Sequence, residues 1–267
     1  MREIAQIGAA QEQRVNALGG QQAANAEHGR AVPIQAGLPR PVEAVVALFG
    51  LLGLAPLIGL AAIAVALSSR GAVFFRQERV GKKGRSFTLY KLRTMQSSGN
   101  GPLVTASNDD RVTMVGRILR KTKVDELPEL WNIVKGEMSL VGPRPEVPRY
   151  VDLDNPLWRL VLQARPGITD PMTLRLRNEE SLLGTVEGNS ERFYLETLQP
   201  FKLKGYLEYL QRRSWSGDVK VLCSTVVAVL VPSKAPPPTL EEIRTHAAKP
   251  PLEYADRSCT NVTKGVS

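Results

Sequence analysis

Cysteine, histidine and aromatic residues are scarce in this chain of 267 residues. It has 2 cysteines and 2 histidines, and aromatic residues make up 6% of its length. With so few thiols and imidazoles, the chain has almost no residues from which to build a zinc site, a Cys/His pair or a Ser/His/Asp triad. Two cysteines allow at most one disulfide, which suits a reducing compartment. The catalytic groups that remain are carboxylates, lysine, arginine and a hard metal ion.

The charge balance points to an acidic partner. The formal net charge is +9 and the pI is near 9.7. Nucleic acid, anionic lipid headgroups and phosphorylated substrates would all suit such a chain. The sequence has no basic run interleaved with aromatic residues that would make a stacking platform for bases. We therefore expect no nucleic-acid partner.

One long apolar run is present, over residues 42–67, with Glu43 as its sole charge. As a helix of roughly 39 Å it could cross a bilayer core of about 30 Å. Pro56 divides it into two pieces, each too short to cross alone, and basic residues flank both ends. A re-entrant or bent helix would keep both ends on the cytoplasmic side. A kinked spanning helix, which composition alone favours slightly, and a buried core helix are the alternatives.

The segment that follows predicts a β-hairpin over residues 72–95. Two β-prone runs, 73–75 and 87–89, surround the turn-like residues 81–84. Lys91 and Arg93 alternate along the second strand and would project on the same side. They would either bind phosphate or solvate an exposed face.

Helical patterns cover much of the remaining chain. A helix over residues 111–121, capped by Asp109 and Asp110, would deliver Arg120 to the segment after it. Residues 191–231 also follow a helical pattern, either as helices in the headgroup layer or as ordinary packed helices. We expect residues 1–40 to be a mobile polar arm rather than a secretory signal, and residues 232–267 to be a disordered tail.

The adjacent carboxylates Asp125 and Glu126 are the leading candidates for chemistry. Apolar residues recur after them with helical spacing, which predicts a helix beginning near Asp125 with that residue as its N-cap. The positive end of a helix keeps a carboxylate ionised and attracts phosphate. An ionised aspartate beside a second carboxylate could be a nucleophile next to a Mg²⁺ ligand. The alternative is a plain helix cap followed by a solvated acid.

Several sequence blocks together resemble the bacterial sugar transferase family, the monotopic polyprenyl-phosphate phosphoglycosyl transferases. The blocks read FFRQERVGKKGRSFTLYKLRTM, VGRILRKTKVDELPELWNIVKGEMSLVGPRPE and RPGITD, and the resemblance runs from about residue 41 to 231. It implies that a phosphosugar moves from a UDP-sugar to a polyprenyl phosphate such as undecaprenyl phosphate, with release of UMP. The product would begin an exopolysaccharide, capsule, O-antigen or glycoconjugate.

The resemblance also implies roles for individual residues. Asp125 matches the nucleophile that attacks the sugar-linked phosphate, and Glu126 matches the Mg²⁺ ligand. Arg120 and Arg144 match basic groups near the diphosphate and nucleotide. Lys91 and Arg93 fall inside a family motif and are further candidates for binding phosphate or nucleotide.

The fold implied is α+β and monotopic, with a re-entrant helix broken at Pro56, a small β-hairpin and several amphipathic helices. Residues 41–70 would form the membrane helix and residues 71–231 a catalytic domain on the cytoplasmic face of the inner membrane. We expect the compact form of the family, with no four-helix membrane domain ahead of the catalytic part. The resemblance leaves open whether the protein forms a homodimer.

Three positions depart from the usual family pattern. Ala55 precedes Pro56 where many members have serine, which removes a hydroxyl from the helix break. Residues 170–180 replace a common continuation of the RPGIT block, at the sugar or nucleotide end of the site. Glu129 stands where glutamine is frequent, and we assign it no catalytic role.

Two other functions fit the sequence. One is a catalytically silent membrane-anchored scaffold of a glycan assembly system, to which the altered segment 170–180 lends some support. The other is a basic peripheral protein that binds anionic lipid or nucleic acid, which would be sensitive to salt.

Overall fold

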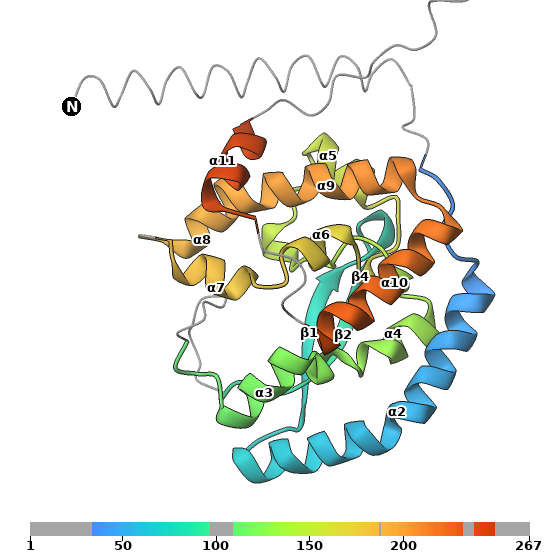
Figure 1. The fold of residues 1–267 in the computed structure, drawn as a ribbon, viewed down its shortest axis with the longest axis vertical. Helices are drawn as coiled ribbons and strands as arrows, with labels where there is room; N and C mark the ends of the chain where they lie inside the picture. Colours follow the sequence, from blue (N-terminus) through green and yellow to red (C-terminus); the bar gives the residue numbers. More distant parts are fainter. Residues whose placement is uncertain (1–33, 97–108, 187, 232–237, 249–267) are drawn as a thin grey trace, which may run out of the picture.

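The protein is a mixed α and β fold in which one long bent helix lies along a body of shorter elements (Figure 1). The computed structural model describes residues 34–96, 109–186, 188–231 and 238–248. The helices are α2 (Arg40–Ser68), α3 (Met114–Thr122), α4 (Glu129–Lys135), α5 (Pro156–Val161), α6 (Pro171–Arg175), α7 (Glu179–Gly184), α8 (Ser190–Phe193), α9 (Gln199–Arg212), α10 (Trp215–Leu230) and α11 (Leu240–Ala248). The strands are β1 (Phe74–Val80), β2 (Ser86–Leu92), β3 (Ser139–Val141) and β4 (Gly167–Thr169).

The strands form two small sheets. β1 and β2 pair antiparallel around a short 3-10 turn, η1 (Lys82–Gly84), so the predicted hairpin is confirmed. β3 and β4 pair in parallel. Strand β4 was not predicted, because a three-residue strand whose partner lies far along the chain leaves no local pattern.

Both halves of helix α2, before and after its bend, pack one side against the shorter elements of the protein. In its first half, Ala47 is fully buried in a cluster with Leu130 and Ile133 of α4. In its second half, Ala61 and Val65 are buried against Leu92 and Leu119. Figure 1 shows α2 bent near its middle, and Pro56 is the residue inside the helix that removes a backbone donor.

Polar contacts fix both ends of α2. Near its start, the buried Glu43 carboxylate accepts a hydrogen bond from Leu140 N at 3.1 Å, and Arg40 donates to the carbonyls of Ile133 and Val134. Just past its end, the Arg93 guanidinium donates to Ser69 O at 2.6 Å and to Arg70 O at 3.1 Å. Both ends of the helix are therefore tied to the body.

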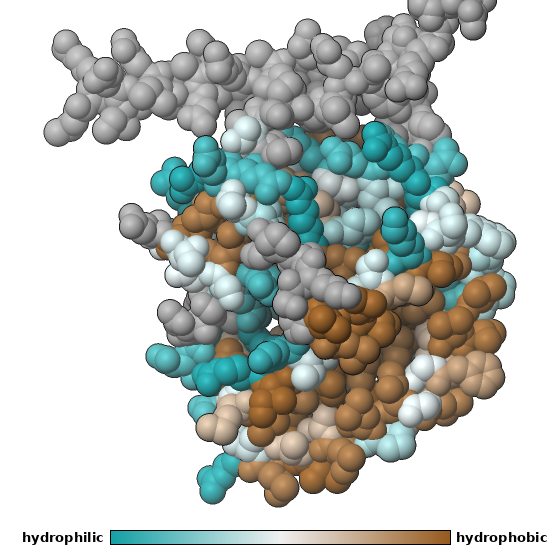
Figure 2. Space-filling model, viewed as in Figure 1, coloured by the Kyte–Doolittle hydropathy of each residue, from teal (hydrophilic) through white to brown (hydrophobic). Residues whose placement is uncertain are grey.

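The outer side of α2 is part of a broad exposed hydrophobic area, which we call the apolar surface. Figure 2 shows hydrophobic side chains gathered over the lower part of the molecule, whereas hydrophilic side chains cover α9. The most exposed hydrophobic members are Phe49, Leu52, Leu60 and Leu67 of α2, Met114 and Ile118 of α3, and Leu230 of α10. A patch of this kind on a protein marks a membrane or partner contact.

The main core lies under α9. Phe201, Leu203 and Tyr206 of α9 are buried in one cluster with Trp158, so α9 is a packed helix and not one that lies in the headgroup layer. The apolar side chains of α10, in contrast, are largely exposed.

Two of the predicted segments lie largely outside the described residues. α11 falls within the range 232–267 assigned to a disordered tail, yet Ile243 is fully buried in the main core. This part of the range therefore does not fit a disordered tail. The predicted mobile arm falls mainly on residues 1–33, which the structure does not describe.

A close backbone approach between β3 and β4 requires glycine at position 167. A Cβ atom on Gly167 would overlap the backbone of Gly142. We expect Gly167→Ala to lower the free energy of unfolding by about 1–3 kcal/mol, because one strand must move away from the other. Thermal unfolding would measure the change. Gly53→Ala is the control, since the described residues leave the space around that position open; equal stability of the two variants would contradict the prediction.

Candidate active site

A sharp turn after α3 carries the two candidate carboxylates into the protein. Lys123 adopts a left-handed conformation (φ 58°), and Val124–Glu126 form a short 3-10 turn, η2. Asp125 and Glu126 are both buried. α4 begins only at Glu129, and η2 has no side-chain capping bond. The predicted N-cap role of Asp125 is therefore wrong, because the left-handed residue and Pro128 delay the start of the helix.

Glu126 is the centre of a cluster of charged side chains. Its Oε1 atom accepts hydrogen bonds from Arg144 Nη2 at 2.6 Å and from Lys91 Nζ at 3.1 Å, and Lys123 Nζ lies 3.7 Å away. Burial alone would raise the pKa of Glu126, but the charges of Arg144, Lys123 and Lys91 hold that pKa well below its usual value. Glu126 is thus a fixed negative charge.

Asp125 differs from its neighbour in having an unpartnered oxygen. Its Oδ1 atom is buried and makes no hydrogen bond to any described residue. Burial raises the pKa of Asp125, and the negative charge of Glu126 raises it further, whereas Lys91, Lys123 and Arg120 act to lower it. A buried carboxylate oxygen with free lone pairs is well placed to attack an electrophile or to bind a cation.

The remaining predicted site residues fall into two groups. Arg120 borders the cluster, donating to Thr94 Oγ1 at 2.9 Å and to Glu180 Oε1 at 2.8 Å. The segment 170–180, which differs from the usual family sequence, therefore contacts the site through Glu180. Arg93 instead holds the end of α2, so it does not lie in the cluster. Its binding of phosphate stays a prediction.

Glu129 belongs to the cluster, although it was assigned no role from the sequence. It is 1% exposed, and its Oε1 lies 3.2 Å from Lys91 Nζ. Burial raises the pKa of Glu129, and the neighbouring Glu126 adds to the shift. The helical spacing between Glu126 and Glu129 was the available signal, since residues three apart lie on one face of a helix.

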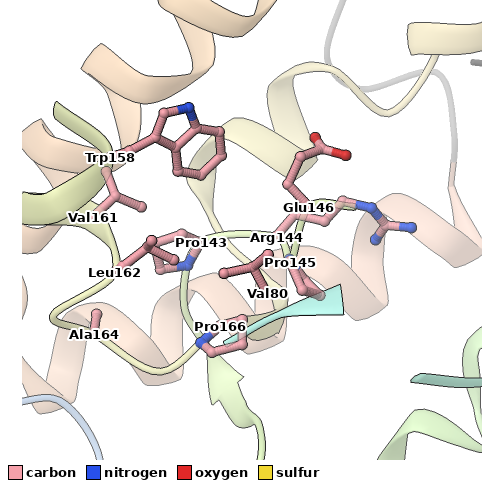
Figure 3. A pocket seen from close by; sticks show the side chains of 10 residues that line it. All are labelled: Val80, Pro143, Arg144, Pro145, Glu146, Trp158, Val161, Leu162, Ala164 and Pro166. Carbon is pink, nitrogen blue, oxygen red and sulfur yellow. The ribbon is translucent and has the colours of Figure 1, made fainter. Parts of the chain in front are cut away.

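Residues 142–146, in which Pro143 and Pro145 flank Arg144, form a rigid turn that we call the proline corner. It directs the Arg144 side chain toward Glu126. Figure 3 shows the Arg144 side chain pointing away from a small void that Trp158 and the flanking prolines help to line. This void is about 10 Å³, which is room for one water molecule and not for a substrate. Arg79 of β1 donates a hydrogen bond to Pro145 O at 2.9 Å and so holds this corner in place.

The carboxylates suit a metal ion that also binds substrate. Among the described residues, no group of three or more His, Cys, Asp or Glu side chains could hold a metal by itself. Mg²⁺ commonly takes one or two carboxylates and completes its shell with substrate phosphates and water. A single carboxylate, Glu126, next to Asp125 fits that pattern.

Comparison with known proteins places these residues in context. The family described as bacterial sugar transferase matches residues 34–232. A UDP-glucose:undecaprenyl-phosphate glucose-1-phosphate transferase of Caulobacter vibrioides is 39% identical over 186 residues, which are 68% of this chain and 65% of that protein. The exopolysaccharide production protein ExoY of Sinorhizobium fredii is 35% identical over 76% of this chain and 90% of its own length. An Escherichia coli protein with the same name as the Caulobacter one is 35% identical over 193 residues. The matched region is 71% of this chain and 39% of that relative.

Proposed function

Because the chain belongs to the bacterial sugar transferase family, we propose that it transfers a phosphosugar from a UDP-sugar to a polyprenyl phosphate and releases UMP. The acceptor is undecaprenyl phosphate, as in the names of two of its relatives. The observation that carries the proposal is the unpartnered, buried Oδ1 of Asp125 within a cluster of cationic side chains. The product would begin a surface glycan, consistent with relatives named for exopolysaccharide production.

The reaction consists of two displacements at one phosphorus atom. In the first, Asp125 Oδ1 bonds to the phosphorus that carries the sugar, and the bond from that phosphorus to the bridging oxygen breaks. The electron pair leaves with UMP. In the second, an oxygen of the acceptor phosphate bonds to the same phosphorus and the Asp125 carboxylate leaves, giving a polyprenyl-diphosphate sugar. Covalent catalysis of this kind divides one difficult exchange into two easier steps.

The side chains around Asp125 stabilise the negative charge of the diphosphate. Lys91 and Arg144 approach Glu126 from two elements, β2 and the proline corner, and Arg120 borders the cluster from α3. Fixed cations in a site partly shielded from water stabilise developing charge strongly. Glu126 would hold Mg²⁺, which when bound would neutralise charge on the diphosphate and on the leaving phosphate.

We further propose that α2 is re-entrant, so that the protein is monotopic and its catalytic part faces the cytoplasm at the inner membrane. As a helix of 29 residues, α2 is roughly 44 Å long, enough to span. Glu43 and Ala47 near one end and Ala61 and Val65 near the other pack on the same body. A spanning helix would carry one of these ends to the opposite side of the bilayer.

Cysteine labelling in cells tests this topology. Ala36→Cys and Arg70→Cys place single thiols beyond the two ends of α2, in a background with Cys223 and Cys259 replaced by serine. Re-entry predicts that an impermeant thiol reagent labels both positions only after the inner membrane is opened. Labelling of one of them in intact cells, from the periplasmic side, would refute it.

The proposed reaction is tested by UMP release from a panel of UDP-sugars with Mg²⁺ and undecaprenyl phosphate. We expect release with at least one sugar, and the sugar that works identifies the donor. A folded, membrane-bound protein that releases no UMP with any donor would instead favour the catalytically silent scaffold.

The pH dependence reports the protonation of the nucleophile. Asp125 must be ionised to attack, and its pKa is raised, so kcat/KM for the UDP-sugar should fall as the pH drops through that raised pKa. The charge of Lys123 lowers the pKa of Asp125. Lys123→Met should therefore move the acid limb of the profile to higher pH. The control is Lys220→Met on α10, which should leave the limb in place; a limb unmoved by Lys123→Met would contradict the assignment.

A further inference from the structure

An apolar groove lies between α2, the β-hairpin and the start of α4. It encloses about 250 Å³, and its apolar lining consists of Leu51, Ile58, Phe74, Tyr90, Pro128 and Trp131. Among the described residues that line it, Arg76 alone is charged. The mechanism above uses none of these side chains.

We propose that this groove binds the isoprenoid chain of the polyprenyl-phosphate acceptor, at the end that carries the phosphate. The inference rests on the proposed function for the identity of the acceptor. The groove itself is described by residues independent of the charged cluster.

The groove and the charged cluster are built on the same elements. Tyr90 lines the groove, whereas the next residue, Lys91, contacts Glu126. Successive side chains of a strand point to opposite faces, so β2 presents one residue to each site. Pro128 likewise lines the groove at the start of α4, shortly after Asp125 in η2. The groove and the charged cluster therefore lie on the two faces of β2, and η2 with the start of α4 supplies residues to both.

The groove is continuous with the apolar surface. Leu51 and Ile58 lie on either side of Pro56, so the bent part of α2 forms one wall. Its rim includes Phe74 and Trp131, which are 44% and 46% exposed. A long hydrocarbon chain can pass from lipid into such a groove without crossing water, which a polyprenyl phosphate requires.

The single charge in the lining complements a ligand with an anionic head. The Arg76 guanidinium lies over the Tyr90 ring, with its carbon 5.9 Å from the ring centre. An arginine that stacks on an aromatic ring keeps its donors available for phosphate. A purely hydrocarbon ligand would gain nothing from this cation, whereas an isoprenoid phosphate would.

Direct binding of undecaprenyl phosphate to the full chain in detergent tests the proposal without requiring turnover. Ile58→Trp fills the groove, and Leu60→Trp adds the same ring to the outer side of the same helix, where Leu60 is 67% exposed. Native mass spectrometry should give an affinity about tenfold weaker for Ile58→Trp, a loss of about 1.4 kcal/mol, and an unchanged affinity for Leu60→Trp. Arg76→Gln, a change at an exposed side chain, should also weaken binding. It provides the test of the groove if Ile58→Trp does not fold.

Two results would overturn the proposal. The first is equal affinity for undecaprenyl phosphate in the parent, Ile58→Trp and Arg76→Gln. The second is equal weakening of phosphatidylglycerol binding by the same variants, which would make the groove a site for bulk phospholipid. Failure of the transferase reaction itself would appear separately, as absent UMP release from a parent protein that still binds the acceptor.

Discussion

Asp125→Asn is expected to reduce UMP release by at least about a thousandfold, because the variant lacks the anionic oxygen that would form the proposed covalent bond. The substitution preserves the size and shape of the side chain. Intact-mass measurement after mixing with the donor should detect a phosphosugar adduct on the parent protein and none on the variant.

The same substitution should leave the folded protein equally stable or more stable. Burial and Glu126 raise the pKa of Asp125 in the folded state, so ionised Asp125 opposes folding at pH 7. This cost is absent at a pH below the usual aspartate pKa, where the group is protonated in both states, and is complete above the raised pKa. Neutral asparagine removes it, and the melting temperature should therefore not fall.

A surface variant provides the matched control for that experiment. Asp154→Asn makes the same chemical change at a side chain that is 99% exposed, and it should retain full activity. An Asp125→Asn protein that is folded and still releases UMP at a similar rate would refute the covalent mechanism. A folded parent that turns over without forming any adduct would also argue against it.

Arg144→Met should impair both stability and activity. Arg144 Nη2 lies 2.6 Å from Glu126 Oε1, and the Glu126 side chain is 10% exposed. Without Arg144, the buried Glu126 charge keeps only Lys91 and Lys123 as cationic neighbours. Its compensation is then incomplete, which costs up to about 3 kcal/mol. We expect the melting temperature to fall by several degrees and UMP release to fall strongly, because a fixed cation near the diphosphate is lost.

A double variant separates these two effects. Adding Glu126→Gln to Arg144→Met removes the charge that Arg144 had stabilised, so part of the lost stability should return while activity stays low. Thermal unfolding of the two single variants and the double variant gives the coupling between the side chains. If the double variant is as unstable as the sum of the singles, the two residues do not stabilise each other in the folded protein.

Local patterns in the sequence predicted the elements that depend on local interactions. The hairpin of β1 and β2 follows from β-prone runs and turn residues near one another in the chain. The pairing of β3 with β4 joins distant segments and was not predicted. The start of α4 was placed too early because spacing alone does not show that Lys123 is left-handed.

The site was predicted to a similar extent. The sequence and the family resemblance identified Asp125, Glu126 and Arg144, which the structure brings together or close in one cluster. Glu129 was assigned no role because glutamine is frequent at its position in the family, whereas its pairing with Lys91 depends on the approach of β2 to α4. Arg93 was grouped with Lys91 by alternation along a strand, yet β2 ends before Arg93 and the side chain turns to α2.

The proposed re-entrant path of α2, whose two ends attach to one body, would have a mechanical consequence for the membrane. A helix that enters and leaves through the same leaflet displaces lipid from that leaflet alone, so the protein would act as a one-sided wedge that favours convex curvature there. It would also be indifferent to bilayer thickness, because no hydrophobic length has to match the distance between the two headgroup layers. Sorting among membranes by thickness, which acts on spanning helices, would then not act on this protein.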